Sequence, residues 1–202
     1  MRRFFTATLF IACAATFAHA QGGGDYNRYD VYVGYSHNRV DTGGDGREGF
    51  NGVEGAVTGN FSRYVGLKGS YSFQRKSFDV GIVVDCVNTP TCPGSVLTTE
   101  NFDLHTLVGG VEFKDNAKES KIKPFAHLLA GFAHSRLHVV NPPTGFSGDS
   151  SDTGFSAVIG GGLNFRVSSR FDIRAVQLDY NPTRFGGETQ HNFRVGVGVV
   201  FR

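Results

Sequence analysis

The last segment of the chain alternates between two kinds of side chain. Every second position from Phe193 to Phe201 is apolar, and charged residues and glycines fill most of the positions between them. A period of two places successive side chains on opposite faces of a β-strand. Phe193 and Phe201 bracket three valines on the apolar face, which is typical of a strand that faces lipid between two aromatic girdles. The segment therefore predicts a membrane-crossing β-strand.

The same alternation recurs along most of the chain. The predicted strands cover residues 31–36, 53–61, 65–74, 101–113, 123–137, 153–167, 170–181 and 190–202. Strands of about 10 residues match the tilted crossing of a bilayer. The chain holds 28 glycines and 19 phenylalanines, and its 19% of charged residues is below the roughly 25% of ordinary domains. This composition favours a strand-rich chain with tight turns.

The connections between these strands alternate in length. Long polar stretches near residues 38–49, 76–100, 138–152 and 182–189 alternate with shorter turns near 62–63, 114–122 and 168–169. Outer-membrane barrels have long outer loops and short periplasmic turns, whereas a β-sandwich, the alternative, does not require this alternation. In lipid every backbone polar group must be paired, so the first and eighth strands must meet. We predict an all-β fold, an eight-stranded antiparallel up-and-down transmembrane β-barrel.

The first 20 residues have the pattern of a cleaved secretory signal. Arg2 and Arg3 precede an apolar stretch, and Ala18-His19-Ala20 supplies the small residues that a signal peptidase reads. An anchor helix fits less well because the stretch is too short to cross a bilayer, and a lipoprotein signal at Ala12-Cys13 is a minor alternative. The expected organisation is a signal over 1–20, a short N-terminal segment over 21–28 and a barrel over 29–202.

Cys86 and Cys92 form an even pair in the longest predicted loop. An exported protein meets an oxidising periplasm, so we expect a local disulfide. A metal site would need more thiols or histidines nearby, and a thioredoxin-like motif needs two residues between the cysteines instead of five. The formal net charge of +2 gives no reason to expect a nucleic-acid partner.

Alternation also assigns charged and amide side chains to the inside of the barrel. The predicted lumen network comprises Glu54, Lys68, Glu112, Gln177, Asp179 and Arg194. An eight-stranded barrel is just wide enough for side chains to fill, so we expect these groups to form ion pairs, with a narrow gated pore as the alternative. Arg174 has the opposite parity to Gln177 and Asp179. It either faces outward near the periplasmic rim or is turned inward by a β-bulge.

The histidines do not form an evident catalytic or metal-binding motif. His134 and Ser135 are adjacent and point to opposite faces of a strand, while His127 and Ser135 share a face but lie too far apart to touch. A partner such as Asp103 or His105 stays open. The acidic loop segments 43–46 and 149–152 lack the order of an EF-hand and are interpreted as solvated turns. We therefore assign no catalytic residue, metal or cofactor.

The signal, the alternating loops and the closing sequence Phe193-Arg194-Val195-Gly196-Val197-Gly198-Val199-Val200-Phe201-Arg202 resemble the OmpA-like and OmpX-like small outer-membrane barrels, a family described as the outer membrane protein beta-barrel domain. The resemblance covers residues 29–202, and the terminal Arg202 departs from the aromatic ending usual in the family. It implies an outer-membrane protein that contacts lipid and the insertion machinery.

Three functions follow from this architecture. The first is a structural and surface-interaction barrel, monomeric, whose loops meet an extracellular or envelope partner. The second is a narrow channel for small polar solutes, and the third is a lipid-modifying enzyme.

Overall fold

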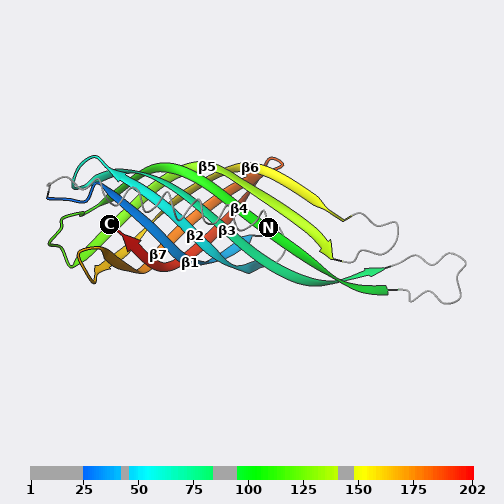
Figure 1. The fold of residues 1–202 in the computed structure, drawn as a ribbon. Helices are drawn as coiled ribbons and strands as arrows, with labels where there is room; N and C mark the ends of the chain where they lie inside the picture. The colour runs from blue at the N-terminus through cyan, green and yellow to red at the C-terminus, as the bar shows by residue number, and fades with distance from the viewer. Residues whose placement is uncertain (1–24, 42–45, 84–94, 141–147) are drawn as a thin grey trace, which may run out of the picture.

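The computed structural model describes residues 25–41, 46–83, 95–140 and 148–202. They form one closed antiparallel barrel in which each strand pairs with its sequence neighbours and β1 pairs with β8, as Figure 1 shows. The strands are β1 (Tyr29–Asp41), β2 (Arg47–Asn60), β3 (Val65–Val83), β4 (Ser95–Lys114), β5 (Ile122–Val140), β6 (Ser150–Arg166), β7 (Phe171–Phe185) and β8 (Glu188–Phe201). The predicted fold class is confirmed. The predicted signal and the cysteine pair lie outside the described residues.

The barrel is polar inside and apolar outside. Among the described residues, 28 buried side chains are polar or charged and 12 are apolar, the reverse of the core of a β-sandwich. Exposed large apolar residues such as Val57, Leu107 and Leu178 cover the outer wall. This arrangement is stable only where the outside solvent is lipid, because so many exposed apolar groups would be unfavourable in water.

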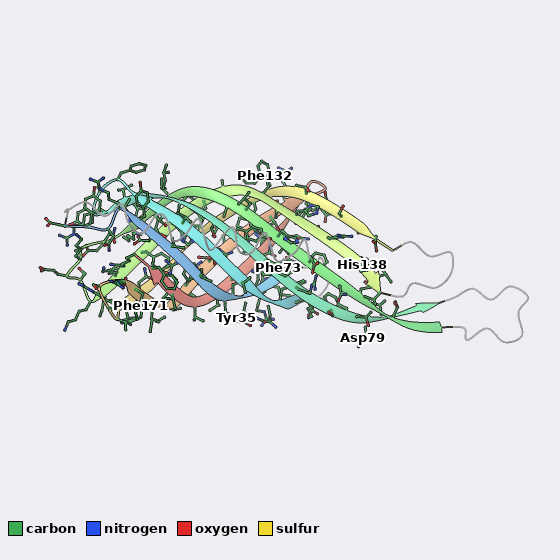
Figure 2. The ribbon with its side chains drawn as sticks, in the orientation of Figure 1. Tyr35, Phe73, Asp79, Phe132, His138 and Phe171 are labelled. Atoms are coloured by element: carbon green, nitrogen blue, oxygen red, sulfur yellow. The ribbon has the colours of Figure 1, made fainter. Side chains whose placement is uncertain are left out.

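Aromatic residues flank this apolar wall at both ends. Near the long loops, the Tyr35, Tyr71 and Tyr180 hydroxyls form hydrogen bonds with Asn51, His105 and His191, respectively. Near the short turns the exposed aromatics include Phe61, Tyr64, Phe113 and Phe201. Figure 2 places Tyr35, Phe73 and Phe132 along the wall and Phe171 at the end opposite Asp79. The amphipathic rings of the tyrosines suit a membrane–water interface, and aromatic girdles flank the apolar band of outer-membrane barrels at both ends.

No helix among the described residues is long and apolar enough to span a membrane.

The connection between β7 and β8 differs from the prediction. Residues 182–189 were expected to form a long loop, but the two strands continue to Phe185 and from Glu188 and are joined by Gly186 and Gly187 alone. Both glycines have positive φ, 56° and 94°, as a two-residue hairpin turn requires. The polar residues of this stretch therefore form strand pairs instead of a loop.

The hairpin of β3 and β4 extends beyond the rest of the barrel (Figure 1). The two strands pair up to Val83 and Ser95, whereas the pairing of β3 with β2 ends at Asn51 and Arg75. Residues 76–83 and 95–100 of the predicted loop over 76–100 are thus strand, and residues 84–94 lie outside the described residues. Residues 76–83 of β3 have no further backbone pair with β2 among the described residues.

Candidate functional site

The lumen contains all six side chains that alternation assigned to it. Glu54, Lys68, Glu112, Gln177, Asp179 and Arg194 are each at most 3% exposed. They come from β2, β3, β4, β7 and β8. They meet in the middle of the barrel because the interior of an eight-stranded barrel is just wide enough for side chains to fill.

Asp179 is the centre of the first part of this network, which it forms with Arg194, Gln177 and Glu54. Its carboxylate accepts hydrogen bonds from Arg194 Nη2 at 2.7 Å and Nε at 3.0 Å, and from Gln177 Nε2 at 2.7 Å. Arg194 Nη2 also lies 3.5 Å from Glu54 Oε1. Glu54 accepts further hydrogen bonds from Ser70 Oγ at 2.8 Å and Gln177 Nε2 at 3.1 Å. One guanidinium thus bridges two buried carboxylates.

His127 connects this first part, through Asp179, to a second part of the network that begins at Lys68. Its Nε2 lies 3.0 Å from Asp179 Oδ1, and its Nδ1 lies 3.1 Å from Lys68 Nζ. A lysine ammonium only donates hydrogen bonds, so Nδ1 accepts and the proton is on Nε2, which donates to Asp179. The contacts select a neutral imidazole of defined tautomer.

Two lysines and two acids continue the series of contacts toward the barrel end that carries the β2–β3, β4–β5 and β6–β7 turns, called here the short-turn end. Lys68 Nζ lies 3.0 Å from Glu112 Oε2, and Lys114 Nζ donates to Glu112 Oε1 at 2.8 Å. Lys114 also donates to Asp30 on β1. A continuous series of polar contacts therefore runs from Asp30 to Glu54.

A β-bulge decides the orientation of Arg174. Three residue steps on β7, from Arg174 to Gln177, span two steps on β8, and Ala175 has no partner in either neighbouring ladder. The extra residue changes the parity of the strand, so Arg174 faces inward together with Gln177. It is 2% exposed and donates to Asn164 Oδ1 at 2.9 Å and Gln177 Oε1 at 2.6 Å. Of the two interpretations that the sequence left open, the inward one holds.

The polar series links all eight strands, since Asn164 contributes β6 and His127 contributes β5. Removing one partner from such a buried ion pair typically costs about 3–5 kcal/mol, because the other charge is left uncompensated. The network therefore locks the relative positions of the strands and fills the middle of the lumen.

An apolar cluster fills the lumen near the long loops. It comprises Val40, Phe50, Leu104 and Ala133, with Phe78, Phe102 and Phe185 packed against it. The Phe50 and Phe102 rings meet edge to face with centroids 5.3 Å apart. The sequence analysis did not single out these residues. A water-filled passage would require their displacement.

The remaining candidate catalytic residues do not converge in the lumen. His134 is exposed and its Nδ1 lies 2.8 Å from Thr153 Oγ1, while Ser135 Oγ donates to the carbonyl of Asp152. Asp103 pairs with Arg75, and His105 with Tyr71. Among the described residues no carboxylate is hydrogen-bonded to His134, and no three His, Cys, Asp or Glu residues are placed to hold a metal.

Several lumen residues were missed by the sequence analysis, although a simple signal could have found them. Lys123 and His127 share parity with the inward Phe125 and Leu129, and Asp30 shares parity with Tyr32. Because side chains alternate between the two faces of a strand, a residue next to an outward-facing apolar residue faces inward. This rule identifies Lys123, His127 and Asp30. The inward position of Asp172 could not be predicted without the β-bulge in β7, because simple alternation places Asp172 on the opposite face from Asp179.

Comparison with known proteins agrees with this geometry. Ail, the attachment invasion locus protein of Yersinia pestis, solved in complex with the heparin analogue sucrose octasulfate, superposes with a TM-score of 0.55 at 20% identity, covering 86% of this chain and 97% of Ail. Neisserial surface protein A gives 0.58 at 14% identity, covering 90% and 99%. OprG, an outer membrane protein of Pseudomonas aeruginosa, gives 0.51 at 10% identity, covering 89% and 97%. These likenesses establish the fold.

No curated protein sequence matches the chain significantly. The family model described as the outer membrane protein beta-barrel domain matches residues 4–201. With the closed barrel, the apolar outer wall and the polar lumen, this match shows that the chain belongs to the outer membrane protein beta-barrel domain family of bacterial outer-membrane proteins.

Proposed function

We propose that the protein is a surface-interaction barrel that presents the β3–β4 hairpin as a docking edge for an extended polypeptide. One observation carries the proposal: residues 76–83 of β3 continue beyond the last pair with β2 and leave one side of the strand without a backbone partner among the described residues. An unpaired strand edge is a template for pairing with another chain.

Cross-strand pairs support the idea that this extension is a stable platform. Arg75 Nε lies 2.5 Å from Asp103 Oδ1, and Ser77 Oγ donates to Asn101 Oδ1 at 2.6 Å. Thr99 Oγ1 donates to Asp79 at 3.1 Å. Such pairs stabilise two-stranded sheets by about 0.2–1 kcal/mol each. An edge held in strand conformation loses less entropy when a partner strand binds.

The filled lumen supports an interaction role over conduction. The ion-pair network and the Phe50 cluster occupy successive layers of an interior that is narrow in any eight-stranded barrel. The turns that join β2 to β3, β4 to β5 and β6 to β7 lie at the opposite end of the barrel from the β3–β4 hairpin. The two-glycine turn between β7 and β8 lies at the hairpin end, together with the long β3–β4 and β5–β6 connections. In this class of barrel the longer loops face outward and the other end faces the periplasm. The docking edge is therefore proposed to lie outside the cell.

The test uses protein purified from outer membranes, reconstituted in nanodiscs and panned against a random-peptide phage library. The comparison variant joins Phe78 to Glu100 through two glycines, which removes residues 79–83 of the edge but keeps Phe78 and Phe102 in the apolar cluster. We expect enriched peptides that bind the wild type and lose binding to the shortened variant. Ser77→Ala changes a side chain but not the backbone edge, so it should retain binding.

Peptides that bind the shortened variant equally well would contradict the docking edge. Steady single-channel steps in planar bilayers would instead favour the narrow channel, because the filled lumen predicts none.

A further inference from the structure

A second cluster of charges lies at the short-turn end of the barrel and is separate from the central network. Arg202 Nη2 donates to Asp172, and Lys123 Nζ lies 4.0 Å from the same carboxylate. The three side chains are at most 3% exposed. One carboxylate thus faces two buried cations, Lys123 and Arg202.

The polar groups of this cluster are not saturated. Lys123 Nζ, Arg202 Nε and Asp172 Oδ1 have no hydrogen-bond partner among the described residues. The next carboxylate, Asp30, already accepts from Lys114. A buried ammonium without a close counter-charge is costly. Bridging water could satisfy the hydrogen bonds but would not supply the missing negative charge.

The whole lumen has the same imbalance. Among the described residues it contains six buried cationic side chains and five buried carboxylates, with His127 neutral by its contacts. The cations are Lys68, Lys114, Lys123, Arg174, Arg194 and Arg202, and the acids are Asp30, Glu54, Glu112, Asp172 and Asp179. The surplus falls at the short-turn end, because the cluster there holds two cations, Lys123 and Arg202, against the single carboxylate of Asp172. The central network holds four cations and four carboxylates. Its Arg174 has no ion pair among the described residues, and its guanidinium instead lies over the rings of Tyr32 and Phe125, 4.1 and 4.0 Å from their centroids.

A pocket of about 150 Å³ opens beside this surplus. It is lined by Asn27, Lys118, Arg166, Ser169 and Arg202, from the N-terminal segment, two short turns, the end of β6 and the chain end. Neither Lys118 nor Arg166 forms an ion pair with a carboxylate among the described residues. Since a water molecule occupies about 30 Å³ of liquid, the pocket has room for one oxyanion group with some hydration.

We infer that this pocket binds a soluble oxyanion, a phosphate or carboxylate group, which enters from the periplasmic side. Arginine side chains donate paired hydrogen bonds to such groups, and Ser169 and Asn27 add neutral donors. The ligand compensates the surplus charge of Arg202 and Lys123. The pocket lies within the ring of turns and the chain terminus, so a soluble anion fits it better than a lipid headgroup on the outer wall.

The experiment titrates protein from outer membranes, reconstituted in phosphatidylcholine nanodiscs, with inorganic phosphate and, separately, with acetate at constant ionic strength. Backbone amide shifts of Ser169 and Arg202 report binding, and the two ligands distinguish phosphate from carboxylate preference. We expect saturable shifts. Arg166→Gln should weaken binding about tenfold, the size expected for a lost charge-assisted hydrogen bond, and Lys118→Gln should weaken it in the same direction.

Arg170→Gln is the matched control. Arg170 is exposed on the same short turn but does not line the pocket, so its replacement should leave the affinity unchanged. The inference is overturned if the shifts do not saturate, or if R170Q and R166Q weaken binding equally. In a parallel arm, phosphatidylglycerol replaces part of the phosphatidylcholine in the disc. The inference is also overturned if this lipid, and neither soluble anion, produces the shifts.

Discussion

Replacing Arg194 with leucine tests whether the buried network holds the barrel together. Arg194 lies 2.7 Å from Asp179 Oδ2 and 3.5 Å from Glu54 Oε1, and all three side chains are at most 1% exposed. The substitution leaves both carboxylates in a closed lumen without their shared guanidinium. Removing one partner of a buried pair costs about 3–5 kcal/mol, and we expect the free energy of unfolding to fall by that amount.

The control is Arg63→Leu. Arg63 also contacts an aspartate through two nitrogens, with Nε 2.8 Å and Nη2 3.2 Å from the Asp115 oxygens, but these side chains are 45% and 31% exposed. Solvent screens exposed pairs, so R63L should cause a much smaller loss than R194L. The comparison isolates the effect of burial because the two pairs have similar contacts.

Urea unfolding in phosphatidylcholine vesicles, followed by far-UV circular dichroism, measures both losses. Tryptophan fluorescence is not an option because the chain has no tryptophan. The stability difference is read from the change in the unfolding midpoint at constant slope. Equal losses for R194L and R63L would refute the claim that the lumen network locks the strands.

Three further predictions concern other parts of the chain. Hydrogen bonding from Arg63 lowers the pKa of Asp115 to about 2, so this turn contributes stability above the unfolded pKa of about 3.9 and loses it as the pH falls through about 2. A carboxyl carbon-13 titration checks the pKa, and R63Q should raise it toward the unfolded value. Gly187→Ala should destabilise the β7–β8 hairpin by about 1–2 kcal/mol because its φ is 94°, whereas Gly69→Ala, in open space, should not; urea unfolding of the two variants measures the difference. Finally, a thiol reagent should reach Cys86 on reduced whole cells, and labelling only after the outer membrane is opened would reverse the assigned topology.

The strand pattern and the inward set of charges could be predicted from local sequence alone. A period of two fixes which side chains share a face, and lipid outside the barrel makes that pattern unusually clear. This is why residues such as Lys68 and Arg194 were assigned to the lumen without any knowledge of their partners. The strand boundaries were less predictable: residues 182–185 and 76–83 were assigned to loops from the sequence but pair as strands.

Only the tertiary structure decided which of the inward groups meet. Contacts such as His127 with Lys68 and Asp179, or Lys123 with Asp172, join strands that are far apart in the sequence. They depend on the register and tilt with which the barrel closes, and one extra residue in β7 was enough to turn Arg174 inward. Alternation is a property of each strand by itself, whereas the charge balance at each level of the lumen is a property of all eight strands together.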